Sequence, residues 1–260
     1  MITSTANAKV KELIKLQKSA KLRREKKLYT AEGLRMFEEV PVSDLISVWV
    51  SESFAGKHRK LLQEKQIRPE ILSDTVFAHV SDTKTPQGVL CVLRQKNYTL
   101  AEMLKDRAPL LLVLDGLQDP GNLGTIFRTA EAAGVTGIVL SDDCVDLYNP
   151  KVIRSTMGSV YRVPFVYTDD LPSALKKMQE RRITLYAAHL DGKNTYDKEV
   201  YLEGTAFLIG NEGNGLKQET AQASDRLIRI PMEGQVESLN AAVAASLLMF
   251  EAGRQRRNRR

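Results

Sequence analysis

The sequence predicts an α/β protein built from two parts: a small N-terminal α/β domain over residues 1–107 and a larger domain over residues 108–260 with a mostly parallel sheet. Two observations predict this. After residue 110, short apolar segments alternate regularly with amphipathic helical segments, which is typical of parallel strands joined by helices. Before residue 97 the elements are shorter, and a polar segment ending in Pro109, where extended backbone is favoured, separates the two regimes.

The composition excludes several classes of protein. With 43% hydrophobic and 27% charged residues in a chain of 260, it is typical of a globular protein and not of a disordered or collagen-like one. No segment approaches the roughly 18 apolar residues of a membrane helix, and the first residues lack the apolar run of a secretion signal, so we expect a cytoplasmic protein without membrane contact. The two cysteines, Cys91 and Cys144, do not have the spacing of metal ligands, and the three histidines are scattered. We therefore expect no metal site.

The net charge of +6 is carried by the two ends of the chain. Residues 1–30 have a net charge of +7 and residues 251–260 have +4, which leaves −5 for the remainder. Such ends are typical of a surface that binds nucleic-acid phosphates, with a solubilising role as the alternative, above all for the C-terminal run. Val10, Leu13 and Ile14 share one face of the N-terminal arm, so we expect an ordered helix there. The cations of this arm are Lys9, Lys11, Lys15, Lys18, Lys21, Arg23, Arg24, Lys26 and Lys27.

Each element follows from a local pattern. Leu34, Phe37 and Val40 recur with helical spacing, and runs of β-branched and apolar residues predict the strands. In the N-terminal domain the patterns predict helices over 29–40, 55–65 and 75–82, and strands over 45–50, 71–73 and 88–93. In the C-terminal domain they predict strands over 110–117, 137–142, 163–168, 183–190, 205–213 and 226–232, and helices over 122–133, 149–160 and 171–182, after Leu216 and from Ser238.

Three glycine-containing loops, residues 119–128, 210–216 and 231–240, are each predicted between a strand and a helix. In a parallel sheet such loops gather at the carboxyl ends of the strands, where ligands bind. Glycine allows a sharp turn there and lets a ligand approach main-chain N–H groups. The sequence has no GxGxxG after the first strand of this domain and no GxxxxGK[ST], so the common nucleotide cradles are missing. It also has no GxSxG elbow with a suitable histidine, so a hydrolase triad has little support.

The three loops carry the motifs NLGxxxR, GNEGxGL and IPMxGxVxSLN, the last followed by an alanine-rich helix. They resemble the three motifs of the SpoU/TrmH family of RNA ribose 2'-O-methyltransferases, within the SPOUT superfamily, over residues 108–256. The segment LYTAEGLRMFEEV resembles the start of the small ribosomal-protein-like domain that binds RNA in many rRNA-modifying members. The resemblance implies a SPOUT domain with a C-terminal trefoil knot, S-adenosyl-L-methionine as cofactor, and a homodimer formed through the knotted domain.

The resemblance also implies roles for individual residues. The catalytic residues that it implies are Arg128, Asn122, Glu212, Ser238 and Asn240. The cofactor-binding residues that it implies are Gly210, Asn211, Glu212, Gly215, Ile230, Met232 and Leu239. Arg128 has the central role, and because an arginine keeps its proton at neutral pH, we favour an electrostatic partner for the alkoxide or a nearby phosphate over a proton acceptor.

These residues also have simpler alternatives. Arg128 could pair with Glu131 on the surface of its helix, and Glu212 could serve only as an anion near a helix N-terminus. Ser238 is the predicted N-cap of the last helix, a role compatible with catalysis. Arg154, on a basic helix, is a further candidate for contact with the RNA backbone.

We therefore expect an S-adenosylmethionine-dependent methyltransferase that acts on a ribose 2'-hydroxyl of large-subunit (23S) rRNA. The separate N-terminal domain favours rRNA, since the tRNA-modifying members generally use short helical extensions. The alternatives are a tRNA 2'-O-methyltransferase and a ribosome-associated RNA-binding protein without catalysis. The presence of both Arg128 and Asn122 argues against the second alternative.

Overall fold

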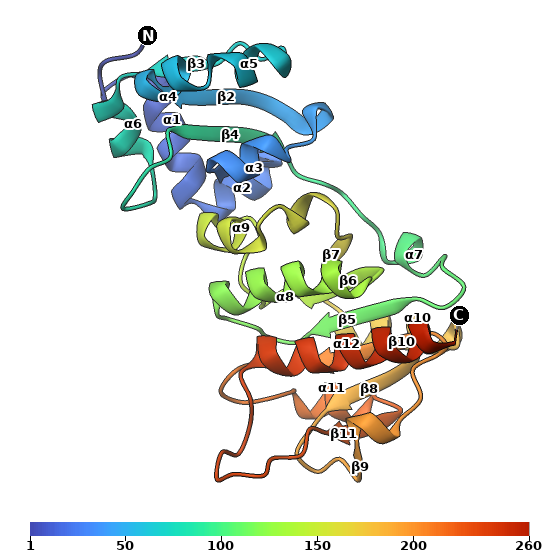
Figure 1. Ribbon diagram of the computed structural model, residues 1–260. Coiled ribbons are helices and arrows are strands. Elements are labelled where there is room, and N and C mark those ends of the chain that lie inside the picture. The colour runs from blue at the N-terminus through green and yellow to red at the C-terminus, as the bar shows by residue number, and fades with distance from the viewer. Residues whose placement is uncertain (260) are drawn as a thin grey trace. The chain divides into compact units, whose positions relative to one another are not determined.

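The computed structural model describes residues 1–259, which form two compact units (Figure 1). The first unit comprises Met1–Lys96 and Asp146–Tyr161, and the second comprises Asn97–Val145 and Arg162–Arg260. The chain therefore leaves the second unit after Val145 and returns to it at Arg162. Among the described residues, no helix combines the length and apolar character needed to cross a membrane.

A mixed four-stranded sheet, in the order β1-β4-β2-β3, forms the centre of the first unit. β4 runs antiparallel to β1 and β2, and β3 runs parallel to β2. The strands are β1 (Leu28–Glu32), β2 (Leu45–Ser51), β3 (Glu70–Leu72) and β4 (Val89–Arg94). The helices are α1 (Ala8–Lys18), α2 (Ala20–Lys26), α3 (Leu34–Glu38), α4 (Glu52–Lys57), α5 (Arg59–Glu64), α6 (Asp74–Val80) and α9 (Pro150–Thr156), with 3-10 turns η1 (Val42–Asp44) and η2 (Ser159–Tyr161).

The basic N-terminal arm is an integral part of this unit. Val10 and Leu13 of α1 are buried as the predicted helix requires, whereas Ile14 is only half-buried. Arg23 of α2 does not fit the prediction of a phosphate-binding cation, because its side chain is only 4% exposed and forms an ion pair with Asp146. Most of the arm therefore presents its cations to solvent, but Arg23 is a structural residue.

Three predicted helices of this unit differ from the structure. The residues predicted to open the helix over 29–40 form β1 instead, because Tyr29 to Glu32 are all buried beside β4, and α3 starts only after Gly33. The helix predicted over 55–65 is divided at His58 into α4 and α5. The helix predicted over 149–160 ends at Thr156, because Met157 adopts left-handed backbone with φ of 52°.

Seven parallel strands form the sheet of the second unit, in the order β7-β6-β5-β10-β8-β11-β9. This confirms the predicted α/β fold. The central strands are buried on both faces, as their continuous apolar runs predict. The six predicted strands are β5 (Leu110–Leu114), β6 (Gly137–Ser141), β7 (Phe165–Thr168), β8 (Thr184–Ala188), β10 (Thr205–Ile209) and β11 (Arg226–Arg229), and the sequence gives no signal for the two-residue β9 (Asn194–Thr195).

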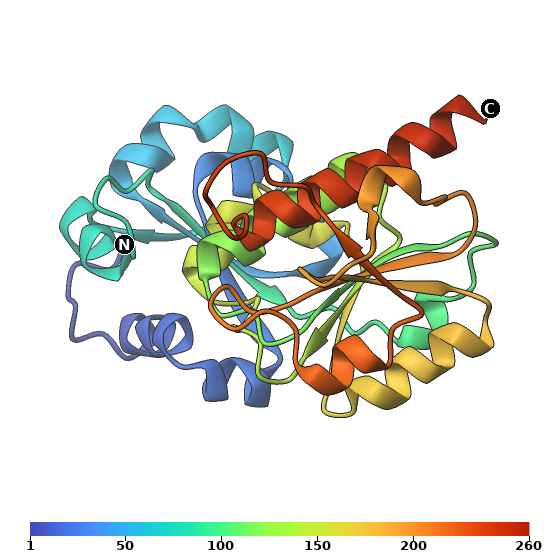
Figure 2. The same cartoon turned by 90° about the horizontal axis from the view of Figure 1, so that it is seen from below.

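Helices cover both faces of this sheet. Figure 2 shows α8 beside α12 on one face and α10 and α11 on the other. The helices are α7 (Leu100–Met103), α8 (Pro120–Ala133), α10 (Leu171–Glu180), α11 (Gln218–Gln222) and α12 (Ala241–Asn258), with the 3-10 turn η3 (Tyr196–Lys198). Asp119 caps α8 by accepting a hydrogen bond from Asn122 N at 2.7 Å, and Pro120 is its first residue. The sequence predicts a loop over residues 119–128, but the first motif lies mostly in the first turns of α8.

Candidate active site

The candidate site lies at the carboxyl edge of the seven-stranded sheet. β5, β10 and β11 are parallel, so the segments that follow them reach the same edge. These segments lead into the first turns of α8, the loop 210–216 and the loop 231–240. The structure thus brings the three sequence motifs to one edge of one unit.

A chain of hydrogen bonds joins one side chain from each motif. Asn122 Nδ2 donates to Glu212 Oε1 at 3.0 Å, and Asn240 Nδ2 donates to Asn122 Oδ1 at 2.9 Å. The Glu212 carboxylate also accepts hydrogen bonds from the backbone N–H groups of Gln118 at 3.1 Å and Asp119 at 3.0 Å. The predicted residues Asn122, Glu212 and Asn240 therefore form one connected network.

This network determines the protonation state of Glu212. Burial raises the pKa of its carboxyl group, but the hydrogen bonds from the Asn122 side chain and from backbone N–H groups outweigh it, so that the pKa lies below its usual value. Glu212 is therefore an anion at neutral pH whose oxygens already accept several hydrogen bonds. Such a group is suited to holding the three motifs together and unsuited to removing a proton from a hydroxyl.

The loop 210–216 closes on itself. Asn211 and Gly215 exchange two backbone hydrogen bonds of 2.9 and 3.0 Å, and a side chain at Gly210 would come within 2.0 Å of the Gly215 carbonyl carbon. Asn211 Nδ2 donates to Gly116 O at 2.8 Å, which fixes the loop to the end of β5. Gly215 has a φ of +69°, so both glycines are required by the shape of this loop.

The segment 230–240 carries the remaining predicted residues. Ile230, Met232 and Leu239 are half-buried. Ser238 is exposed, and the prediction that it is the N-cap of α12 is wrong. The N-cap is Asn240, whose Oδ1 accepts hydrogen bonds from Ala242 N and Val243 N. Asparagine is as favourable at this position as serine, and helix α12 starts two residues later than the sequence predicts.

Arg128 lies on α8, six residues after Asn122, and is exposed. Within residues 1–259 it forms no hydrogen bond or ion pair. The alternative in which it pairs with Glu131 is wrong, because Glu131 forms an ion pair with Arg162 instead. The guanidinium of Arg128 is thus available to an anionic group of a ligand.

A second cluster, which sequence analysis missed, lies at the same edge. Lys217 Nζ is 3.1 Å from Asp115 Oδ1 and 2.9 Å from Asp143 Oδ2. Asp115 is fully buried, and its Oδ2 accepts hydrogen bonds from Thr220 Oγ1 at 2.7 Å and Lys217 N at 3.2 Å. Hydrogen bonding to Asp143 raises the pKa of Lys217, and hydrogen bonds from Ser141 and Lys217 lower that of Asp143. The one available signal was Asp115, a charge placed directly after the apolar strand LLLVL.

The loop after β8 also reaches this edge and was not predicted as part of the site. His189 N donates to Ile228 O at 2.9 Å. At Gly192 a side chain would meet the backbone of Ile228 and Arg229 at 2.5 and 2.7 Å, so glycine permits the close approach of this loop to β11. No group of three or more potential metal ligands occurs in the part of the chain that the structure describes.

Comparison with known proteins identifies the family of this chain. The SpoU rRNA Methylase family matches residues 109–250, and the MRM3-like substrate binding domain matches residues 7–91. The 23S rRNA (guanosine(2553)-2'-O)-methyltransferase RlmP of Bacillus subtilis is 34% identical over 251 residues, which cover 96% of this chain and 97% of that protein.

Solved structures of similar proteins extend over both units. The SpoU methyltransferase AviRb from Streptomyces viridochromogenes has a TM-score of 0.86 at 26% identity and covers 98% of this chain and 99% of its own. The AdoMet-bound rRNA methyltransferase from Sinorhizobium meliloti has a TM-score of 0.84 at 30% identity, with 97% of each chain covered. The resemblance expected from the three motifs is confirmed, and the chain belongs to the SpoU rRNA methylase family.

Proposed function

We propose that this protein transfers a methyl group from S-adenosylmethionine to a ribose 2'-hydroxyl of large-subunit rRNA, in the cytoplasm. The observation that carries the proposal is the hydrogen-bond chain from Glu212 through Asn122 to Asn240, which joins all three motifs. Arg128, exposed on α8, belongs to the first of these motifs. The rRNA 2'-O-methyltransferase activity named for RlmP supports the substrate and the reaction.

The loops at this edge fit S-adenosylmethionine. At Gly210 the backbone is so close to Gly215 that only glycine is possible, and loops of this kind present main-chain groups to a ligand without intervening side chains. When bound, S-adenosylmethionine supplies an electrophilic methyl group on a sulfonium cation. The anion Glu212 lies in the segment that follows β10, where it favours a cation, whereas Asp143 after β6 already has Lys217 as its counter-ion. We assign cofactor binding to Gly210, Asn211, Glu212, Gly215, Ile230, Met232 and Leu239.

The acceptor hydroxyl is a weak nucleophile, so the protein must orient it and stabilise the charge that develops on its oxygen. Arg128 is a permanent cation with five N–H donors, and we assign it to the developing alkoxide or to an adjacent phosphate. Asn122, in the first turn of α8, and Asn240, the N-cap of α12, orient each other through their hydrogen bond. Glu212 accepts a hydrogen bond from Asn122 and so links the second motif to the other two. We retain Ser238, which is exposed at the same loop, as a contact to substrate.

Binding of the RNA backbone is assigned to the outer face of α1. Lys11, Lys15 and Lys18 recur at helical spacing on the face opposite the buried Val10 and Leu13, and all three are exposed. Three neighbouring cations on one face match the phosphates of an RNA strand. Within the C-terminal run, Arg256 is a structural residue, because it donates hydrogen bonds to the carbonyl groups of Ala108, Pro109, Tyr201 and Glu203.

A homodimer is proposed through α12. Val243, Leu247 and Phe250 lie at helical spacing and remain 47%, 36% and 45% exposed, although α12 packs against α8 on its other side. An exposed apolar stripe of this kind is typical of a protein interface. We also propose the trefoil knot of the SPOUT superfamily for the C-terminal segment, and keep residues 1–107 and 108–260 as the proposed functional domains.

The test is transfer of labelled methyl from S-adenosylmethionine to purified rRNA or tRNA that lacks the modification, followed by digestion to nucleosides. We expect a labelled 2'-O-methylnucleoside from rRNA alone. Label in tRNA alone would move the substrate to tRNA and keep the chemistry. Cofactor binding without transfer to either RNA would favour a non-catalytic RNA-binding protein.

A further inference from the structure

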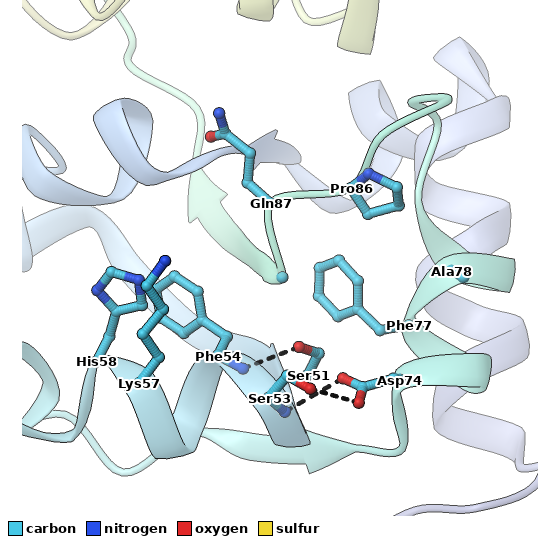
Figure 3. Close-up of a pocket in the computed structure, with 11 residues that line it drawn as sticks. Ser51, Ser53, Phe54, Lys57, His58, Asp74, Phe77, Ala78, Pro86 and Gln87 are labelled. Carbon is cyan, nitrogen blue, oxygen red and sulfur yellow. Dashed lines mark hydrogen bonds between the residues drawn. The ribbon is translucent and has the colours of Figure 1, made fainter.

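The first unit contains a hollow of about 350 Å³ that the proposed function has not used (Figure 3). It lies between α4, α6 and the turn that leads into β4, and its volume is at the lower end of the range for small-ligand sites. The residues that line it are Ser51, Ser53, Phe54, Lys57, His58, Asp74, Phe77, Ala78, Pro86, Gln87 and Gly88.

Aromatic side chains make two walls of the hollow. Phe54 stacks on His58, with ring centres 4.3 Å apart and planes inclined by 23°, and Figure 3 shows Phe77 on the opposite side. Gly88 holds this arrangement, because a side chain there would come within 2.8 Å of Phe54 Cβ and Ser51 Oγ, and its φ is +83°. The walls are therefore fixed by tight packing before any ligand arrives.

Two opposite charges lie in the same hollow and do not neutralise each other. Within residues 1–259, neither Lys57 nor Asp74 forms an ion pair. Asp74 accepts hydrogen bonds from Ser53 N at 3.2 Å and Ser53 Oγ at 2.6 Å, one on each oxygen, and these bonds lower the pKa of its carboxyl group. A carboxylate offers about four acceptor positions, so about two remain on Asp74 for a ligand.

We propose that this hollow binds one unpaired guanine nucleotide of the RNA substrate. Lys57 contacts its phosphate, the half-buried His58 ring, stacked on the buried Phe54, contacts the base, and Asp74 accepts the two adjacent N–H groups of the guanine edge. Among the four bases, guanine alone presents two such donors side by side. A simple anion would be repelled by Asp74, and an apolar ligand would leave both charges without partners. RNA-binding proteins commonly read unpaired bases through such stacking and edge contacts. This inference rests on the proposed function, which makes RNA the substrate.

The experiment compares full-length variants in methyl transfer to an rRNA fragment that lacks the modification. Lys57→Met removes the cation, Asp74→Asn replaces one acceptor by a donor, and Ala78→Trp fills the hollow from an exposed position on α6. We expect each to raise the KM for RNA at least tenfold, with kcat and the Kd for S-adenosylmethionine unchanged. Lys60→Met is the matched control, because Lys60 lies on α5 with a side chain 91% exposed and outside the hollow, and it should change KM less than twofold.

A second measurement is independent of catalysis. Guanosine 5'-monophosphate, titrated into the 15N-labelled full chain, should shift the amide signals of residues 51–58, 74–78 and 86–88 more strongly than the adenosine, cytidine or uridine monophosphates do. An unchanged KM in Ala78→Trp, or shifts by guanosine monophosphate only outside these residues, would overturn the inference. If the unmodified protein transfers no methyl to any RNA, the proposed function fails, while the titration still decides whether the hollow binds a guanine nucleotide.

Discussion

Arg23 and Asp146, which are 123 residues apart, form an ion pair in the first unit, with Arg23 Nη2 2.6 Å from Asp146 Oδ2. Their side chains are 4% and 16% exposed. Arg23 also donates to the carbonyl groups of Leu16 at 3.0 Å and Gln17 at 2.5 Å, so its guanidinium group has its partners within the protein. This one guanidinium joins α1, α2 and the segment Asp146–Tyr161.

Arg23→Ala should destabilise the protein strongly. It leaves Asp146 as an uncompensated charge and two carbonyl groups without their donor, and removal of one partner from a buried ion pair costs about 3–5 kcal/mol. Urea unfolding followed by circular dichroism measures the loss. Arg24→Ala, the exposed neighbour on the same helix, is the control and should change the free energy of unfolding by less than about 0.5 kcal/mol. Equal effects of the two substitutions would contradict the structural role of Arg23.

Arg128→Ala should abolish methyl transfer and leave cofactor binding intact. The exposed guanidinium has no partner among the described residues, so its loss costs the fold little and removes only a contact to substrate. A hundredfold or greater fall in kcat with an unchanged Kd for S-adenosylmethionine by calorimetry is expected, since single electrostatic donors contribute about that much. Arg181→Ala, exposed at the end of α10, should retain full activity. Normal turnover by Arg128→Ala would remove this residue from the mechanism.

Glu212 should make stability depend on acidic pH. Its pKa in the folded protein is lowered, so its ionised form stabilises the fold above the unfolded value of about 4.3, and this contribution disappears as the pH falls through the lower folded pKa. The free energy of unfolding should therefore fall between about pH 5 and pH 3. In Glu212→Gln that fall should be smaller than in the unmodified protein. An identical pH dependence in both proteins would show that the network does not favour the anion.

Lys217→Met should destabilise the second unit, because it leaves the buried Asp115 without its counter-ion. Lys217 is itself 47% exposed, so we expect a loss of about 1–3 kcal/mol and not the full cost of breaking a buried pair. Adding Asp115→Asn to Lys217→Met should recover part of the loss, since the amide carries no charge. Additive losses in the double variant would mean that the two side chains do not interact.

Phe250→Glu should yield a monomer. It places a charge within the exposed apolar stripe of α12 that we assign to the homodimer. Light scattering after size-exclusion chromatography measures the mass directly. Val42→Glu, at a 63% exposed position of the first unit, serves as the control and should leave the mass unchanged. A monomer in the unmodified protein would exclude the dimer at once.

The strands of the second unit could be predicted because their signal is local. LLLVL and TAFLI are continuous apolar runs, and each lies buried on both faces. The helix predicted over YTAE is wrong. Alanine and glutamate favour helices by intrinsic propensity, but pairing with β4 makes this segment a strand. Asn194–Thr195 is too short and polar to carry any pattern, and pairing with β11 alone defines it.

The candidate site was predictable in part for the same reason. Asn122, Glu212 and Asn240 were found through their motifs, and the structure joins them by hydrogen bonds. Lys217 was missed because nothing in its local sequence marks it, and the charge of Asp115 after LLLVL does not reveal a partner 102 residues away. The role of Ser238 as a helix cap was wrong because Asn240, two residues later, offers the same hydrogen bond to α12.

The passage of Asp146–Tyr161 through the first unit limits how this protein can be recombined. A chimaera that exchanges only the N-terminal segment would bring in a foreign surface opposite Asp146 and Tyr148, whose partners Arg23 and Tyr29 would be gone. A chimaera that exchanges the first unit between relatives therefore has to replace both of its segments, Met1–Lys96 and Asp146–Tyr161.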